Sequence, residues 1–177
     1  MKQNNIALAR RSSGGGTVYH DLGNVNCTFV VPQAVMDRSE HLKIVAQALQ
    51  NCWSLPVSLN ERNDLVLHDK KISGSAYKIS IKASYHHCTL LVDAHMPWLR
   101  ACLQSPLAAA ITSKSVASVR SSVTNMVDHV TQPHTNPLTV DLLCAAISAA
   151  YQRSYAANSA VQAIVALTLT ADITKAI

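Results

Sequence analysis

RRSSGGGTVYHDLGN, residues 10–24, is the most informative stretch of this 177-residue chain. It combines two arginines, two serines, three consecutive glycines and a His-Asp pair. Consecutive glycines let a backbone turn freely and approach a ligand closely, and an arginine guanidinium pairs with phosphate through its planar fork. The stretch therefore indicates a loop that folds over a phosphorylated ligand. On composition alone, a glycine hairpin between two strands is the alternative.

Segments with strand character lie on both sides of this loop. NIALA, residues 5–9, predicts a strand that enters the loop, and CTFVV, residues 27–31, predicts a strand that leaves it. A P-loop or a Rossmann turn connects a strand to a helix instead. The strand–loop–strand order argues against a dinucleotide or Walker-type site.

The rest of the chain interleaves strands with two or three helices and has no regular βαβ repeat. Apolar residues recur on one helical face over residues 39–53, with Ser39 as the cap, and again over 140–157, with Thr139 as the cap. The other predicted elements are a helix over 97–103, strands over 65–67, 77–83 and 87–94, a turn at 84–86, and a strand within 161–173. We expect an α+β fold with a mixed, mainly antiparallel sheet and flanking helices.

The composition fits one domain with a substantial core: 49% of the residues are hydrophobic and 14% are charged. No apolar run is long enough to span a bilayer, and the first residues lack the apolar core of a signal peptide. The net charge is +5, but the basic residues are scattered and aromatics are only 5%, which favours a nucleotide and an acidic protein partner over a nucleic acid. Five widely spaced cysteines without a CxxC motif indicate free thiols in a reducing compartment.

Four further blocks follow the glycine loop in order. They are RNDL at 62–65, KISGSA at 71–76, HHCTLL at 86–91 and SVRSSVTNM at 118–126. With RRSSGGGTVYHDLGN they resemble the lipoate–protein ligase A family, which carries the corresponding blocks in the same order. The resemblance implies the mixed antiparallel sheet that this family shares with biotin ligases and class II aminoacyl-tRNA synthetases. It also implies ATP and lipoate as substrates, with Mg²⁺.

The resemblance selects Lys71 as the central catalytic cation, in contact with both ATP and lipoate. Joining a carboxylate to a nucleotide brings two anions together, and a fixed ammonium between them stabilises the developing charge. Arg11 and Lys78 would hold phosphate, Ser13 would donate a hydrogen bond to it, and Asn24 would cap the polar end of the ligand. The loop residues implied in contact with the adenylate are Gly14, Gly15, Gly16, Thr17, Val18 and Tyr19.

Three other groups invite a chemical interpretation. Asp64 would meet Mg²⁺ bound to the triphosphate, because Mg²⁺ favours a carboxylate together with phosphates. His20 and Asp21 are neighbours on an extended chain and point to opposite faces, so we expect a structural histidine and no catalytic dyad. Cys88 is the one thiol that resembles an acyl carrier, beside His86 and His87. The family has glycine at this position, so we interpret Cys88 as a small-residue substitution, and His87 as a pocket or scaffold residue without metal partners.

The chain departs from the family at four points. Glu61 and Cys88 replace glycines, and Lys78 stands where arginine is frequent, which weakens a bidentate phosphate contact. The fourth is length: from the resemblance we expect residues 1–177 to correspond to part of the catalytic domain, without the N-terminal pocket segment and the C-terminal accessory domain.

Three functions remain open. The first is a ligase that activates lipoate with ATP to lipoyl-AMP. It then modifies a lysine on the acyltransferase subunits of 2-oxoacid dehydrogenases and on the glycine-cleavage H protein. The second is a lipoyltransferase that uses preformed lipoyl-AMP or a protein-bound lipoyl group, and the third is an inactive remnant that binds only nucleotide or a partner. We expect a cytoplasmic protein that binds neither nucleic acid nor membrane, with mitochondria as the alternative compartment.

Overall fold

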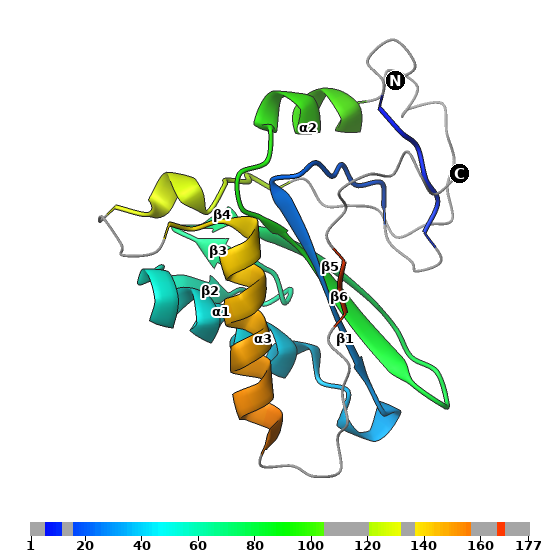
Figure 1. Cartoon of the computed structure of the whole chain (residues 1–177). Helices are drawn as coiled ribbons and strands as arrows, with labels where there is room; N and C mark the ends of the chain where they lie inside the picture. The colour runs from blue at the N-terminus through cyan, green and yellow to red at the C-terminus, as the bar shows by residue number, and fades with distance from the viewer. Residues whose placement is uncertain (1–5, 12–15, 105–120, 132–136, 157–165, 169–177) are drawn as a thin grey trace.

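The computed structural model describes residues 6–11, 16–104, 121–131, 137–156 and 166–168 (Figure 1). It has the expected α+β architecture, with two antiparallel sheets and three α-helices in the described residues. The larger sheet has the order β5-β6-β1-β7, and the smaller one has the order β2-β3-β4. The strands are β1 Asn24–Val31, β2 Val57–Leu59, β3 Leu65–Leu67, β4 Lys70–Lys71, β5 Ser73–Lys78, β6 Ser84–Leu91 and β7 Ala166–Thr168. The helices are α1 Arg38–Trp53, α2 Met96–Leu103 and α3 Val140–Ala156.

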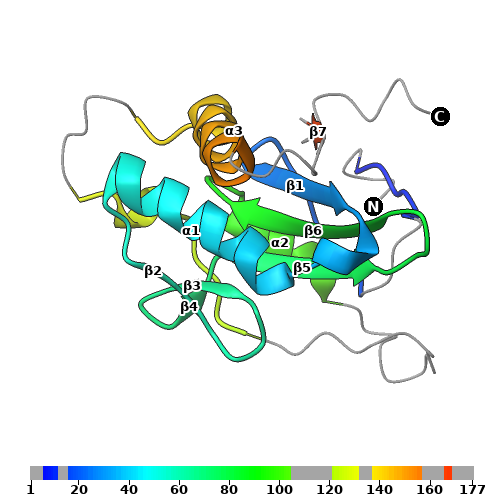
Figure 2. The ribbon, with the colours of Figure 1, turned by 90° about the horizontal axis from the view of Figure 1, so that it is seen from below.

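Strands β1 and β6 form the centre of the larger sheet, with Cys27 opposite Cys88 in the register. Side chains alternate between the two faces of the sheet, and one face of β1 and β6 is fully buried. Helices α1 and α3 pack on this face, whereas residues 6–11 lie on the other side (Figures 1 and 2). The opposite face carries Asn26 and Thr28, which are partly exposed, and is called the open face. The residues of the buried face are Val25, Cys27, Phe29, Val31, Ser84, His86, Cys88 and Leu90.

The two long helices form where the periodicity predicts them. Leu42, Val45 and Leu49 of α1 are completely buried, as are Leu143 and Ile147 of α3. The Thr139 hydroxyl accepts a hydrogen bond from the Leu142 amide at 3.3 Å, which confirms the predicted cap of α3.

The predicted cap of α1 was wrong by two residues. Asp37 precedes the helix, and its carboxylate accepts hydrogen bonds from the backbone amides of Ser39 at 2.8 Å and Glu40 at 3.2 Å. A carboxylate accepts these amide hydrogens more strongly than a hydroxyl does, because it also complements the positive end of the helix dipole.

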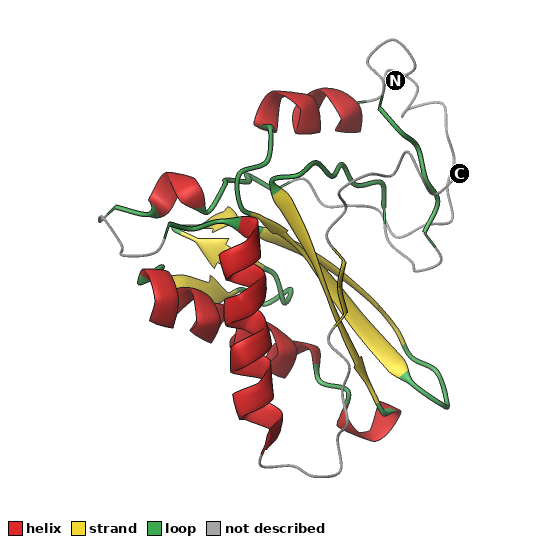
Figure 3. Cartoon of the chain, in the orientation of Figure 1, coloured by secondary structure: helices red, strands yellow, loops and turns green. Residues whose placement is uncertain are grey.

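Several predicted strands differ from the structure (Figure 3). The strand predicted over 87–94 runs from Ser84 to Leu91 instead, and the predicted turn at 84–86 is wrong, because these residues pair with β1. Residues 6–9 are not a strand, because no neighbouring strand pairs with them and Leu8 is exposed. The strand predicted over 77–83 begins earlier, at Ser73, and ends at Lys78. Residues 79–83 form the turn into β6, where the Ser80 amide donates to the Ser84 hydroxyl and Ile81 is 95% exposed. Of the strand predicted within 161–173, residues 166–168 are confirmed as β7, and the rest lies outside the described residues.

The close approach of residues 21–24 to the end of β6 requires glycine at position 23. The Gly23 carbonyl accepts hydrogen bonds from the amides of Val92 at 3.0 Å and Asp93 at 2.9 Å. A Cβ added to Gly23 would overlap the backbone carbonyl group of Asp93. Two backbones therefore meet here without room for a side chain.

We expect Gly23→Ala to lower the free energy of unfolding by about 2–3 kcal/mol, because only a backbone shift relieves the overlap. Gly74→Ala is the matched control, since its Cβ would meet only the Thr89 hydroxyl at 3.4 Å, an ordinary contact. Urea denaturation of both variants checks this prediction. Equal stabilities for the two variants would contradict the packing described here.

Candidate active site

Lys71 lies at the junction of three chain segments. It ends the short strand β4, where Val66 of β3 is its antiparallel partner. Its backbone amide donates to the Ser122 carbonyl at 2.8 Å, and its carbonyl accepts from the Thr124 amide at 3.2 Å. The parallel bridge between Lys71 and Val123 therefore brings the block at 118–126 to the lysine, which the sequence alone did not show.

The Lys71 ammonium forms an ion pair with the Asp64 carboxylate at 2.8 Å. The two side chains are only 24% and 10% exposed, so the pair is partly shielded from water. The neighbouring Lys70, in contrast, is exposed. The two consecutive lysines therefore differ in exposure, and Lys71 has a partner, Asp64, that we had not predicted. The catalytic role of Lys71 stays a prediction.

A tight turn positions Asp64. The side-chain oxygen of Asn60 accepts hydrogen bonds from the backbone amides of Arg62 at 3.0 Å and Asp64 at 2.9 Å. Asn63 adopts the left-handed conformation with φ 57°, which asparagine tolerates better than most residues. The chain then enters β3, where the Leu65 amide donates to the Ser73 hydroxyl at 2.8 Å.

A second group of polar residues lies on the open face of the larger sheet. The Asn24 amide nitrogen donates to His20 Nδ1 at 2.7 Å. The Asn24 carbonyl oxygen is buried and accepts no hydrogen bond from any described residue. An unpaired buried oxygen is costly, so this amide is suited to the polar end of a ligand, as we predicted for Asn24.

Arg11 makes this region electrically positive. Its guanidinium donates to the Gly16 carbonyl at 2.7 Å. Burial, and then the nearby charge of Arg11, lower the pKa of His87. The same two causes lower the pKa of His20, which Asp21 and Asn24 partly offset. At neutral pH the two imidazoles are therefore uncharged, and the arginine supplies the cation.

The other predicted ligand-binding residues differ in exposure and position. Gly16 and Tyr19 are half-buried, whereas Thr17 and Val18 are exposed. Ser13, Gly14 and Gly15 lie outside the described residues. Lys78 lies at the far end of β5, about 17 Å along the strand from Ser73, so the structure does not bring it to Lys71. The ligand contacts of all these residues stay predictions.

His20 and Asp21 form no dyad. The Asp21 carboxylate accepts hydrogen bonds from the Gly23 amide at 3.0 Å and from the His95 amide at 2.8 Å. Asp21 therefore joins this loop to the start of α2, and its role is structural, as the alternation of an extended chain predicts.

Cys88 points into the core and not toward the open face. It is 1% exposed and lies opposite Cys27. A hydrogen bond with Cys27 and burial raise its pKa well above that of a free thiol. A thiol kept protonated and buried is a poor nucleophile, which supports the interpretation of Cys88 as a small-residue substitution.

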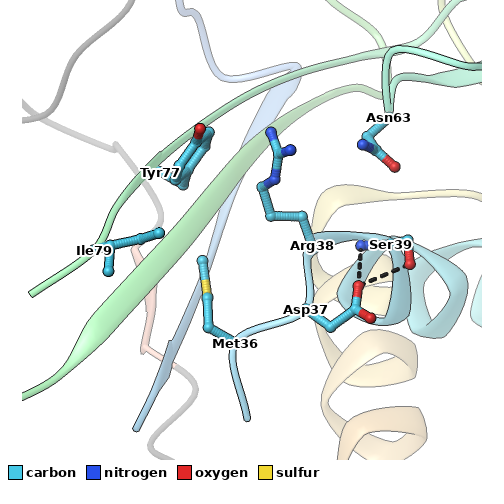
Figure 4. Close-up of a pocket in the computed structure, with 7 residues that line it drawn as sticks. All are labelled: Met36, Asp37, Arg38, Ser39, Asn63, Tyr77 and Ile79. Atoms are coloured by element: carbon cyan, nitrogen blue, oxygen red, sulfur yellow. Dashed lines mark hydrogen bonds between the residues drawn. The ribbon is translucent and has the colours of Figure 1, made fainter. Parts of the chain in front are cut away.

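A cavity near α1 lies apart from the predicted site residues. The cavity, about 420 Å³, lies at the start of α1, where the Arg38 guanidinium is 4.2 Å from the centre of the Tyr77 ring (Figure 4). None of the predicted site residues lines it. Among the described residues, no three His, Cys, Asp or Glu side chains are arranged to hold a metal ion, and no helix is long and apolar enough to cross a membrane.

Known proteins resemble the chain in sequence over most of its length. The lipoyl protein ligase A/B catalytic domain matches residues 1–152. The mitochondrial lipoyl amidotransferase LIPT1 of Homo sapiens is 45% identical over 130 residues, which cover 72% of this chain and 35% of that protein. Lipoate-protein ligase A of Psychrobacter cryohalolentis is 43% identical over 128 residues, which cover 72% of this chain and 37% of that protein. The chain spans about a third of the length of these curated relatives.

Solved structures agree with this match. A lipoate-protein ligase A bound with ATP superposes with a TM-score of 0.65 at 26% identity, covering 88% of this chain and 62% of that chain. A bipartite lipoate protein ligase of Thermoplasma acidophilum, described with its E2 lipoyl domain, gives a TM-score of 0.64 at 28% identity, covering 88% and 60%.

Proposed function

Since the chain belongs to the lipoyl protein ligase A/B catalytic domain family, we propose that it attaches lipoyl groups to lysines of acceptor proteins. The observation that carries this proposal is the placement of Lys71. Its ammonium is partly shielded, fixed by Asp64 and held at the backbone by residues 122–124. This is the arrangement that a reaction between two anionic groups requires.

The primary proposal is an ATP-dependent ligase, whose reaction has two steps. The lipoate carboxylate attacks the α-phosphorus of ATP, so that lipoyl-AMP forms and pyrophosphate leaves. The acceptor lysine then attacks the lipoyl carbonyl, an amide bond forms, and AMP leaves. Lys71 would stabilise the negative charge that develops on the phosphate and then on the carbonyl oxygen.

Arg11 and Asn24 would orient the adenylate. The guanidinium supplies a fixed cation on the open face, and the unpaired Asn24 oxygen accepts a hydrogen bond from the ligand. The loop at 13–19 would close over the nucleotide, with Lys78 as a further cation.

Mg²⁺ fits this site as a partner of the nucleotide and not as a resident metal of the protein. Asp64 supplies one carboxylate, and Mg²⁺ is commonly held by one or two carboxylates together with substrate phosphates. The ion would neutralise the charge of the triphosphate. Among the described residues, Asp64 belongs to no group of three or more His, Cys, Asp or Glu side chains that could hold a metal ion.

A lipoyltransferase is the second candidate, because one relative is a lipoyl amidotransferase at 45% identity. It would accept lipoyl-AMP or a protein-bound lipoyl group without using ATP. We propose the lipoyl domains of 2-oxoacid dehydrogenase acyltransferase subunits and the glycine-cleavage H protein as acceptors in either case. An E2 lipoyl domain belongs to the lipoylation system of the archaeal relative. The compartment would be the cytoplasm or, as for the human relative, mitochondria.

Lipoate-dependent exchange of labelled pyrophosphate into ATP distinguishes the two candidates. A ligase catalyses the exchange, because formation of lipoyl-AMP is reversible. A transferase gives no exchange but still moves the lipoyl group from lipoyl-AMP to a lipoyl domain. A chain that does neither is the inactive remnant, which would contradict the proposal.

A further inference from the structure

The ion pair between Asp64 and Lys71 forms without any substrate, and the backbone holds both of its members in place. A lysine side chain has four rotatable bonds and loses considerable entropy when it is fixed. Both members of this pair are held by rigid segments. The turn closed by Asn60 fixes Asp64, and backbone hydrogen bonds to Ser122 and Thr124 fix Lys71.

The pair leaves part of the Lys71 ammonium available. An ammonium group has three N–H donors, and the contact with Asp64 uses one of them. The others remain for an anionic ligand. The negative charge of Asp64, however, lies beside any anion that Lys71 binds and repels it.

Resting on the proposed function, we propose that Asp64 is the positioning residue for Lys71: its carboxylate fixes the ammonium before the anionic substrate arrives, at the cost of weaker binding of that substrate. When the charge of Asp64 is removed, the transfer rate constant should therefore fall while the affinity for the anionic substrate rises. A residue that only stabilised the fold would not separate the two.

Asp64→Asn is the informative variant, since it removes the charge and keeps the shape and the backbone of the turn. We expect the transfer rate constant from saturating lipoyl-AMP to fall about tenfold, because a displaced cation stabilises the transition state less well. The dissociation constant of lipoyl-AMP is expected to fall about threefold, since a repulsive charge is gone. Asp64→Glu, which keeps the charge, is expected to recover most of the rate.

Asp69→Asn is the matched control. Asp69 is exposed in the turn between β3 and β4, five residues from Asp64, and has φ 64°, a conformation that asparagine also adopts. The Asp69→Asn variant removes one negative charge from the other end of β3 and leaves the ion pair intact. Its transfer rate constant and its affinity for lipoyl-AMP should therefore stay at wild-type values. Equal rates for Asp64→Asn and Asp69→Asn, or lipoyl-AMP binding by Asp64→Asn that is unchanged or weaker than in the wild type, would overturn the proposal.

NMR of ¹⁵N-labelled lysine ammonium groups tests the same claim without substrate. The Lys71 signal, identified by its loss in Lys71→Arg, should be rigid in the wild type and in Asp69→Asn, and mobile in Asp64→Asn. A Lys71 ammonium as mobile in the wild type as in Asp64→Asn would refute the positioning role. If the wild type used no lipoyl-AMP, the proposed function would fail, and the NMR comparison would still decide the role of Asp64.

Discussion

Lys71→Ala is expected to slow lipoyl transfer from lipoyl-AMP to an acceptor lipoyl domain by about 10²–10³-fold. Removing one fixed charge that stabilises a developing oxyanion typically has an effect of this size. The ammonium of Lys71 is paired with Asp64. Its backbone is hydrogen-bonded to Ser122 and Thr124. Single-turnover transfer, followed by the mass of the acceptor, measures the effect.

Lys70→Ala is the control for this prediction. Lys70 has the same charge and lies in the same strand, but its side chain is exposed. The transfer rate of the Lys70→Ala variant should stay within about twofold of the wild type, since exposed surface charges contribute little to the energy of a nearby site. If the two variants lost activity equally, the central role of Lys71 would be wrong.

Acidification from pH 7.5 to pH 5.0 is expected to lower the free energy of unfolding by about 4 kcal/mol. His41 and His86 are completely buried and stack with Phe29, His41 at 4.5 Å between ring centroids. None of their ring nitrogens has a hydrogen-bond partner among the described residues. A charged imidazole here would lack both water and a hydrogen-bond acceptor, so both rings are neutral in the folded protein.

The sign follows from the two folded-state pKa values. Burial lowers the pKa of His41 to about 4, although Asp37 and Glu40 partly oppose it. Burial, and then the charges of His41, Arg38 and His87, lower the pKa of His86 to about 3. The unfolded chain takes up these protons near pH 6.5 and the folded chain does not. This stability is therefore complete above pH 6.5 and is lost as the pH falls toward the folded-state values.

Urea denaturation at both pH values checks this prediction. His41→Phe removes one of the two groups and should reduce the loss by about 2 kcal/mol. His68→Asn is the control, since His68 is exposed at φ 45° and asparagine tolerates this conformation. Because burial also lowers the pKa of His20 and His87, both add to the loss. Equal stability at pH 7.5 and 5.0 would show that the buried rings are not kept neutral.

The periodicity of apolar residues predicted the elements whose structure depends on nearby residues. The apolar periodicity placed both long helices, because helix faces repeat every three to four residues. It failed at Ile79 and Ile81, where alternation continues beyond the point at which Tyr85 of β6 pairs with the last residue of β5. Alternation describes an extended chain, and whether a partner strand lies beside it depends on distant residues.

The sequence indicated candidate site residues but not their arrangement. The order of the motifs indicated Lys71, yet its contact with Asp64 depends on a hairpin whose turn uses His68 and Asp69 in left-handed conformations, without a glycine. The bridge to Val123 joins residues more than fifty positions apart. Such contacts follow from the assembled sheet, and a single sequence gives no signal for them.

Calorimetric titration of lipoyl-AMP into the 177-residue chain measures whether Lys71 contributes to ligand binding. We expect saturable binding at one site, weakened at least tenfold by Lys71→Ala and unchanged by Lys70→Ala. The same affinity in Lys71→Ala as in the wild type, or no binding by a wild-type chain that circular dichroism shows to be folded, would contradict this expectation.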